Sequence, residues 1–238
     1  MRFAIFAFVS WATVVNAQTR NVWKSEDIDS QLSRLGQPLV IAKGSNYLLA
    51  LDTAARGASA LQTDRDGDRI LWIRRGSGTL FMGEQRHELG PGDLVSIGHG
   101  ISYRFEVSSA RLEYVALRIG LGGDPNIQRL YGGPKAMPAV VHRPDANEIL
   151  HSGENFALLN ALQPTSWPAP LTHEDCVEIY FVTGGPGVVD LGTGSRARSN
   201  DVDTGDVVIV PRNTSHNLVV HEKQGEKIEY LLFRVISE

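Results

Sequence analysis

The sequence contains the same pattern twice, and this internal repeat restricts the fold more than any other feature. Residues 69–78 (RILWIRRGSG) correspond to residues 178–187 (EIYFVTGGPG), and residues 91–98 (PGDLVSIG) correspond to residues 204–211 (TGDVVIVP). The two signatures occur in the same order in both copies, and each copy closes on a further apolar segment. A duplicated unit of this size predicts two structural repeats of similar fold within one chain.

Within each copy, short apolar runs alternate with glycine, aspartate, asparagine and proline. Runs such as 47–51, 78–82 and 94–97 have the length of β-strands, and the turn residues between them favour tight reversals of the chain. Helical periodicity is convincing only at residues 25–35, where Ser25 is a candidate N-cap. We therefore predict an all-β fold with a short N-terminal helix. A generic β-sandwich is the alternative, and the paired order of the signatures disfavours it.

The second copy is longer than the first by four residues. The spacing from Gly76 to Gly92 is 16 residues, whereas the spacing from Gly185 to Gly205 is 20 residues. The extra residues are placed most easily in a hairpin around residues 192–200, which are rich in glycine and polar residues.

The N-terminus has the features of a secretory signal peptide. Arg2 gives a positive start, residues 3–15 are almost wholly apolar, and a small residue precedes a cleavage point before Gln18. The apolar run is too short to span a bilayer comfortably, and a retained membrane anchor is the alternative. We predict a signal peptide over residues 1–17 and a secreted or periplasmic protein. Cys176 is the single cysteine, so no intramolecular disulfide is expected.

The composition is that of an ordinary globular protein, with 42% hydrophobic and 21% charged residues. The net charge is −4, and no run of lysine and arginine exceeds two residues, so the sequence has no nucleic-acid-binding signature. The expected partner is a small-molecule ligand or substrate. We do not expect binding to nucleic acid, or to a membrane once the signal peptide is removed. The sequence leaves the oligomeric state open between a monomer and a homodimer.

The second copy carries histidine, glutamate, glycine and proline residues at fixed spacings. They are His173, Glu178 and Gly185 in the first signature and Gly205, Pro211 and His216 in the second. Their order and spacing resemble the two motifs of the cupin superfamily, although Asn213 replaces a motif glycine and Val220 replaces the final asparagine. The resemblance covers most of residues 38–236. It implies a bicupin, with two tandem double-stranded β-helix (jelly-roll) barrels.

The repeat and the resemblance together divide the chain into five parts. These are the signal peptide 1–17, an N-terminal helical segment 18–37, cupin 1 at 38–120, a glycine- and proline-rich connection at 121–150, and cupin 2 at 151–238.

The resemblance implies one metal site, built in cupin 2 from His173, Glu178 and His216. Leu171 stands where the motif has a further histidine, and strand alternation would direct it into the same cavity as His173. Two imidazoles and one carboxylate suit non-haem iron and can also hold zinc, and manganese and nickel are equally open. The alternative is a degenerate site in which these residues line a pocket without a metal.

Several neighbours of the proposed ligands have candidate roles of their own. Asp175, Cys176 and His221 lie close in the sequence and are alternative sources of the missing ligand, although an unreactive buried thiol is the favoured interpretation of Cys176. Strand alternation predicts that Tyr180 faces the cavity as a pocket residue, whereas Ile179 packs on the outside of the barrel.

Cupin 1 lacks the metal-binding residues. Asp64, Arg69 and Tyr103 occupy the three ligand positions, and a guanidinium in place of the carboxylate would repel a cation. We expect this barrel to be metal-free and structural. Binding of an anionic or polar ligand through Arg69 is the alternative.

The resemblance implies a mononuclear metal-dependent enzyme that acts on a small oxygenated organic molecule, because metal-binding cupins include dioxygenases, isomerases and lyases. The residues do not indicate which of these reactions is catalysed, since proteins of one fold catalyse many different reactions. The alternative is a non-enzymatic extracytoplasmic cupin that binds a metal or a small ligand. The chain has no Gly-x-Ser-x-Gly element, which argues against an α/β-hydrolase.

Overall fold

The structure is a computed structural model that describes residues 20–35, 38–44, 47–65, 67–120, 140–141, 148–152, 156–163, 169–220 and 227–236. The predicted signal peptide, most of the predicted connection and His221 lie outside the described residues. No helix in the described part of the chain has the length and apolar character needed to cross a membrane.

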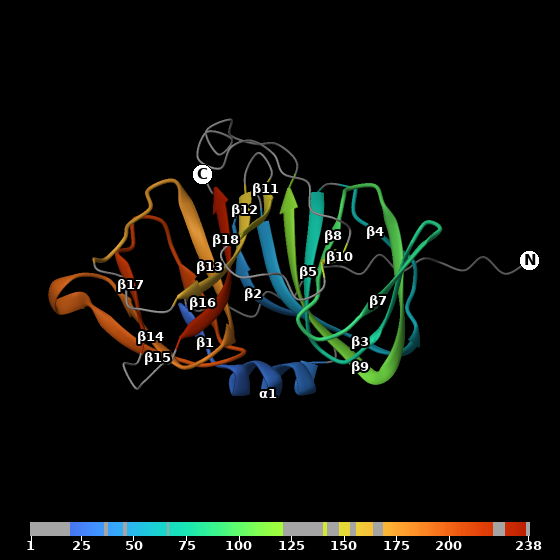
Figure 1. Ribbon diagram of the computed structural model, residues 1–238, viewed down its shortest axis with the longest axis horizontal. Coiled ribbons are helices and arrows are strands. Elements are labelled where there is room, and N and C mark those ends of the chain that lie inside the picture. Colours follow the sequence, from blue (N-terminus) through green and yellow to red (C-terminus); the bar gives the residue numbers. More distant parts are fainter. Residues whose placement is uncertain are drawn as a thin grey trace, which may run out of the picture.

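The described strands form two barrels that stand side by side, with one helix beneath their junction (Figure 1). The first barrel is one nine-stranded sheet: β2 (Leu39–Lys43), β3 (Tyr47–Ala58), β4 (Gln62–Thr63), β5 (Gly67–Arg75), β6 (Gly78–Met82), β7 (Gln85–Leu89), β8 (Leu94–Ile97), β9 (Ser102–Gly120) and β10 (Val140–Val141). The predicted all-β fold with a short N-terminal helix is confirmed.

The second barrel is built from two sheets. Its six-stranded sheet contains β1 (Val22–Trp23), β11 (Glu148–Ser152), β12 (Phe156–Gln163), β13 (Cys176–Gly184), β16 (Val207–Val210) and β18 (Ile228–Ile236). Its three-stranded sheet contains β14 (Gly187–Leu191), β15 (Arg198–Val202) and β17 (His216–Val220).

The repeat seen in the sequence is also a repeat of backbone geometry. Gly76 follows β5 and Gly185 follows β13, and both have positive φ angles, of 87° and 80°. A Cβ atom would lie 2.2 Å from the carbonyl oxygen of Arg111 at the first position and 2.0 Å from that of Lys227 at the second. Glycine is therefore required twice at the same place in the fold, both for the backbone conformation and for the close approach of the backbone in or just before the closing strand.

The four extra residues of the second repeat lie where the spacing predicts them. A two-residue turn at 83–84 joins β6 to β7, whereas a six-residue loop at 192–197 joins β14 to β15. The longer loop contains a short 3-10 helix, η1 (Gly194–Arg196).

A large apolar core lies between the two barrels. Equivalent aromatic residues meet there, with the ring centroids of Trp72 on β5 and Phe181 on β13 lying 5.7 Å apart. Ile179 belongs to the same inter-barrel cluster, whereas Tyr180 belongs to the cluster inside the second barrel, so both predictions from strand alternation are confirmed. Burial of each such side chain contributes about 1.5–3 kcal/mol, which makes this interface a main source of stability.

Segments outside the repeats complete both barrels at their sheet edges. Val22 of β1 pairs with Val208 of the second barrel, and Val140 of β10 pairs with Val95 of the first. These pairings cover edge strands that would otherwise present unpaired backbone groups. The N-terminal segment thus adds a strand to the second barrel, and β11 begins at Glu148, inside the predicted connection.

Helix α1 (Ser25–Leu35) has the predicted bounds, but the prediction of Ser25 as its N-cap is wrong. Ser25 is already helical, and the carbonyl of Lys24 accepts the Ile28 N–H at 3.0 Å. The carboxylate of Asp206 accepts the Ser25 N–H at 2.8 Å and lies 2.8 Å from the Lys24 ammonium. The start of the helix is therefore held by the Gly-Asp turn of the second repeat, a long-range contact that local sequence does not reveal.

Candidate metal centre

The structure brings together the three residues predicted as metal ligands. Glu178 lies on β13, His216 is the first residue of β17, and His173 lies in the segment that precedes β13. One ligand atom from each lies within 4.8 Å of the others. Glu178 and His216 are buried, whereas the side chain of His173 is 28% exposed, so the cluster opens on the side of His173.

A turn and a single β-bridge hold the segment that carries His173. The backbone groups of Leu171 and His216 exchange two hydrogen bonds, of 2.8 and 2.9 Å, and the Asn213 N–H donates to the carbonyl of His173 at 2.8 Å. Asn213 has a φ of 58° and is the single non-glycine residue with positive φ in the described part of the chain. Asparagine tolerates this conformation better than most residues, so it preserves the turn although it replaces the glycine of the motif.

The Glu178 carboxylate is the centre of a hydrogen-bonded cluster. Its Oε2 lies 2.7 Å from the Nε2 of His216 and accepts the hydroxyl of Tyr180 at 2.9 Å. Its Oε1 accepts the Nε–H of Arg234 at 2.6 Å and lies 3.4 Å from the Nε2 of His173. The cluster therefore contains the predicted pocket residue Tyr180 and one cation, Arg234.

The protonation states favour ligation. Burial alone would raise the pKa of Glu178, but the hydrogen bond with His216 and the charge of Arg234 outweigh it and lower that pKa to about 2. Burial lowers the pKa of His173, and the nearby charge of Arg234 adds to the effect against the attraction of Glu178. A charged carboxylate and a neutral imidazole are the forms that bind metal ions.

Two further contacts fit a cation at this place. The Nδ1 of His216 lies 3.3 Å from the carbonyl oxygen of Thr214, which would accept a proton from Nδ1 when Nε2 binds a metal ion. The Nε2 of His173 is buried and makes no hydrogen bond in the described structure. A buried nitrogen without a partner is unfavourable, and a metal ion would satisfy it. The residues present therefore fit a divalent cation.

Leu171 is placed by its bridge to His216, and not by strand alternation with His173 as predicted. Residues 172–175 do not form a strand, so alternation cannot relate Leu171 to His173. Its direct bridge partner is His216, and paired residues of an antiparallel bridge project to the same face. Leu171 is 38% exposed, which puts an apolar side chain near the open side of the cluster.

The alternative ligands have mixed support. His173, Asp175 and Cys176 form a second group whose ligand atoms lie within 4.8 Å of one another. Burial and the charges of Glu178 and Asp175 raise the pKa of Cys176 to about 12, so this thiol is protonated at neutral pH. That result agrees with an unreactive buried thiol, whereas Asp175 is exposed.

Arg234 is the functional residue that the sequence interpretation missed. It lies on β18 directly opposite Glu178 in the strand register. A signal for it exists, because residues 112–119 (LEYVALRI) and 228–235 (IEYLLFRV) share an E-Y-x-x-x-R pattern that places Arg118 and Arg234 at equivalent positions. An arginine within an apolar closing strand of both repeats indicates an inward-facing partner.

The equivalent positions of the first barrel form a closed ion-pair network. The Nε of Arg69 lies 2.6 Å from Asp64, and the Arg69 guanidinium also donates to Tyr103. The Tyr103 hydroxyl donates to Gln62 at 2.8 Å, and Arg118 lies 3.7 Å from Asp64. Among the described residues, the groups that could hold a metal all lie in the second barrel.

Comparisons with known proteins agree on the fold. No family model matches the chain, and no curated protein sequence matches it. A cupin 2 conserved barrel domain protein from Leptotrichia buccalis has 16% identity and a TM-score of 0.62, over 83% of this chain and 88% of that chain. AerE from Microcystis aeruginosa has 13% identity and a TM-score of 0.58, over 84% and 97% of the two chains. A variant of oxalate decarboxylase from Bacillus subtilis has 12% identity and a TM-score of 0.54, over 92% and 78%.

These likenesses show the cupin fold, as the two motifs predicted. The molecule is a two-barrel cupin-fold protein whose candidate metal centre lies in the second barrel.

Proposed function

We propose that this protein is a mononuclear metal-dependent enzyme that acts on a small oxygenated organic molecule outside the cytoplasm. The observation that carries the proposal is the convergence of two imidazoles and one carboxylate within 4.8 Å, with the Nε2 of His173 buried and unsatisfied. A bound divalent ion would supply Lewis-acid chemistry, or redox chemistry if the ion is iron.

The surrounding side chains have defined tasks in this proposal. Burial and the adjacent Glu178 charge hold the pKa of Tyr180 well above 10.0, so its hydroxyl keeps its proton and donates to Glu178. Arg234 neutralises part of the Glu178 charge and places a guanidinium beside the site, where it favours a negatively charged group on a substrate. Leu171 presents an exposed apolar side chain on the face that it shares with His216.

Metal analysis of the purified mature protein tests the site. We expect stoichiometric metal in the wild-type protein and at least about a tenfold loss of metal affinity in His173→Ala and His216→Ala, since each removes one of three ligands. His99→Ala is the matched control, because His99 is an exposed histidine of the first barrel. Unchanged metal content in both site variants would show that the ligand set is wrong.

The identity of the metal separates the reaction classes. Bound iron favours oxygen chemistry, which oxygen consumption with phenolic and keto-acid substrates would detect. Bound zinc or manganese favours an isomerase or lyase, and mass spectrometry of substrate mixtures incubated without oxygen would detect those products.

A non-enzymatic binding protein is the second candidate, and one observation favours it. Both oxygens of Glu178 already have partners within the protein, in Arg234, Tyr180 and His216, so the carboxylate is compensated without a metal. Metal binding without turnover across a broad substrate screen would support this candidate over the enzyme.

Export is a separate part of the proposal. The apolar N-terminus supports a secreted or periplasmic location, and N-terminal sequencing of protein recovered from the extracytoplasmic fraction tests it. A mature chain that begins at Gln18 is the expected result. A chain that retains residues 1–17 and stays with the membrane would contradict cleavage.

A further inference from the structure

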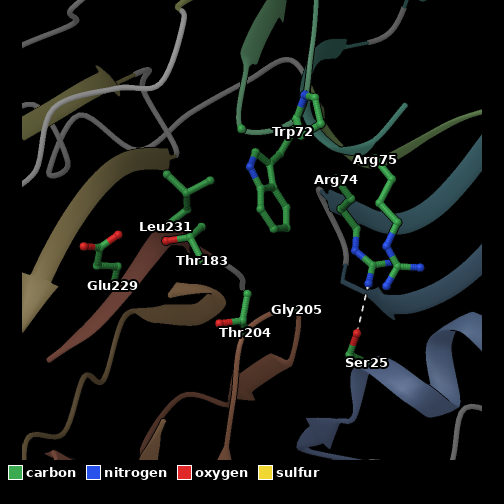
Figure 2. Close-up of a pocket in the computed structure, with 11 residues that line it drawn as sticks. Ser25, Trp72, Arg74, Arg75, Thr183, Thr204, Gly205, Glu229 and Leu231 are labelled. Carbon is green, nitrogen blue, oxygen red and sulfur yellow. Dashed lines mark hydrogen bonds between the residues drawn. The ribbon is translucent and has the colours of Figure 1, made fainter. Parts of the chain in front are cut away.

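A cavity of about 470 Å³ lies between the two barrels, where α1 begins (Figure 2). The ends of β5 and β13 and the start of β18 line it, together with the equivalent turns at residues 91–92 and 204–205 of the two repeats. None of the three candidate metal ligands lines the cavity, so it is a place distinct from the metal centre.

A buried arginine with poor hydrogen bonds forms part of the cavity wall. The side chain of Arg74 is 4% exposed, yet its nearest partners are the Ser25 hydroxyl at 3.3 Å and the Asp29 carboxylate at 3.4 Å. Charge-assisted hydrogen bonds are normally about 2.7–2.9 Å long. Burial lowers the pKa of Arg74 below its ordinary value, in line with these long contacts. An anion in the cavity would supply the short bonds that the described residues do not.

Arg74 and Arg75 line the cavity and belong to an ion-pair cluster behind its wall that contains more cationic than anionic groups. Arg75 lies 2.7 Å from Asp29 and 3.7 Å from Glu113, and Arg111 also pairs with Glu113. Three guanidinium groups, including that of Arg74, therefore share two carboxylates. This excess of positive charge near the cavity favours a negatively charged group on a ligand.

The opposite wall of the cavity carries a negative charge, that of Glu229. Figure 2 shows Glu229 on the far side of the cavity from Arg74 and Arg75, with Trp72 and Leu231 between the two ends. Glu229 is exposed and forms no ion pair with any described residue. The cavity thus has a cationic end, an apolar middle and an anionic end.

The duplication explains this asymmetry. Glu113 and Glu229 occupy the same position of the E-Y-x-x-x-R pattern in the two closing strands. In the first repeat, Arg74 and Arg75 on β5 face Glu113, whereas the second repeat has Thr183 and a glycine at the corresponding positions of β13. Without arginines at these positions of β13, Glu229 lacks the kind of ion pair that Glu113 makes with Arg74 and Arg75.

We propose that this cavity is a second ligand site for a small zwitterion that carries a carboxylate and an ammonium group at opposite ends of a short apolar chain. The carboxylate binds Arg74 and Arg75, the chain packs on Trp72 and Leu231, and the ammonium faces Glu229. The volume lies within the range of small-molecule sites, about 300–1,000 Å³. The hydroxyls of Thr183 and Thr204 offer further hydrogen bonds.

Calorimetric titration of the full mature protein with 6-aminohexanoate, hexanoate and hexylamine tests the proposal. We expect 6-aminohexanoate to bind most tightly, and each probe that lacks one charged end to bind about tenfold more weakly. Equal affinity for 6-aminohexanoate and hexanoate would overturn the assignment of a zwitterion. Absence of saturable binding to the folded protein would overturn the site.

Two exposed positions allow substitutions that keep the fold. Arg75→Gln should weaken 6-aminohexanoate and hexanoate about tenfold, and Glu229→Gln should weaken 6-aminohexanoate and hexylamine but not hexanoate. Arg86→Gln is the matched control, because Arg86 is an exposed arginine of β7 in the first barrel. His216→Ala should bind all three probes as the wild-type protein does. Affinities that are unchanged in both Arg75→Gln and Glu229→Gln would place the binding elsewhere and overturn the proposal.

Discussion

Arg69 and Glu178 occupy the same position in the two barrels and carry opposite charges. Each pairs in strand register with an arginine of the closing strand, Arg118 in the first barrel and Arg234 in the second. The carboxylate of Glu178 lies close to the imidazoles of His173 and His216 and binds the guanidinium of Arg234. The guanidinium of Arg69 instead contacts the carboxylate of Asp64 and the polar groups of Gln62 and Tyr103. The opposite charges at this position, together with the differences at the two histidine positions, separate a barrel that fits a cation from one whose charged groups pair with one another.

The ion pair of the first barrel is expected to stabilise the fold without affecting the metal centre. Arg69→Met removes the closest partner of Asp64, and both side chains are only 16% exposed. We expect the free energy of unfolding, measured by urea denaturation, to fall by about 2 kcal/mol, because a part-buried carboxylate loses its main partner. Metal content should stay unchanged.

Arg86→Met is the control, since the Arg86–Glu88 pair is largely exposed, and the stability of this variant should match that of the wild type. Loss of metal in Arg69→Met would contradict the independence of the two barrels.

Leu171→His should add a fourth ligand. Leu171 is the bridge partner of His216, and a histidine at this position would project to the same face as His216. We expect the affinity for zinc to rise about tenfold or more, measured by competition with a chelator. Thr172→His introduces the same side chain at the next exposed position, which lacks the bridge, and should leave the affinity unchanged. Equal gains in the two variants would show that the effect is not geometric.

The fold was largely predictable because its main determinants are local. Positive φ at Gly76 and Gly185 requires glycine at the same place in both repeats, and the motif spacing then sets the strand lengths. The convergence of His173, Glu178 and His216 was predictable from the same spacing.

The parts that were not predicted depend on contacts between distant segments. Asp206 caps a helix that starts 181 residues earlier, and Arg234 meets Glu178 across a strand pairing 56 residues away. The two-residue strand β1 is too short to show alternation, so its pairing with β16 left no pattern in the sequence. The segment that carries His173 deviates from strand geometry at residues 172–175, which periodicity could not indicate.

Arg234→Met should destabilise the metal-free protein more than the metal-bound protein. Without a metal, Arg234 is the cation nearest to Glu178, and its loss leaves a buried carboxylate with less compensation, at a cost of about 2 kcal/mol. A bound divalent ion would take over that role, and the removal of a nearby positive charge would raise metal affinity.

Urea denaturation of wild-type and Arg234→Met protein, each with chelator and with saturating metal, measures both effects. Arg118→Met is the matched control, because Arg118 has the equivalent position in the first barrel, and its effect on stability should be the same with and without metal. An Arg234→Met variant with the same loss of stability in both conditions would argue against a cation at Glu178.

Asp52 should make the stability of the first barrel depend on pH. Asp52 lies on β3, accepts hydrogen bonds from the Thr53 N–H and the Tyr114 hydroxyl, and has a pKa raised above 3.8 because burial outweighs these contacts. A carboxyl group whose pKa is higher in the folded state stabilises the fold below its unfolded pKa, and this contribution is lost as pH rises through the folded pKa. Asp52→Asn cannot ionise, so its stability relative to the wild type should increase from pH about 4 upward and then level off.

Urea denaturation of both proteins across a series of pH values between about 4 and 8 measures this difference, and subtraction cancels the titration of the groups that they share. Glu84→Gln removes an exposed carboxylate from the β6–β7 turn and should give a flat difference curve. A difference for Asp52→Asn that is constant, or that decreases as the pH rises, would mean that this part-buried carboxyl group is better compensated when charged than its contacts with Thr53 and Tyr114 indicate.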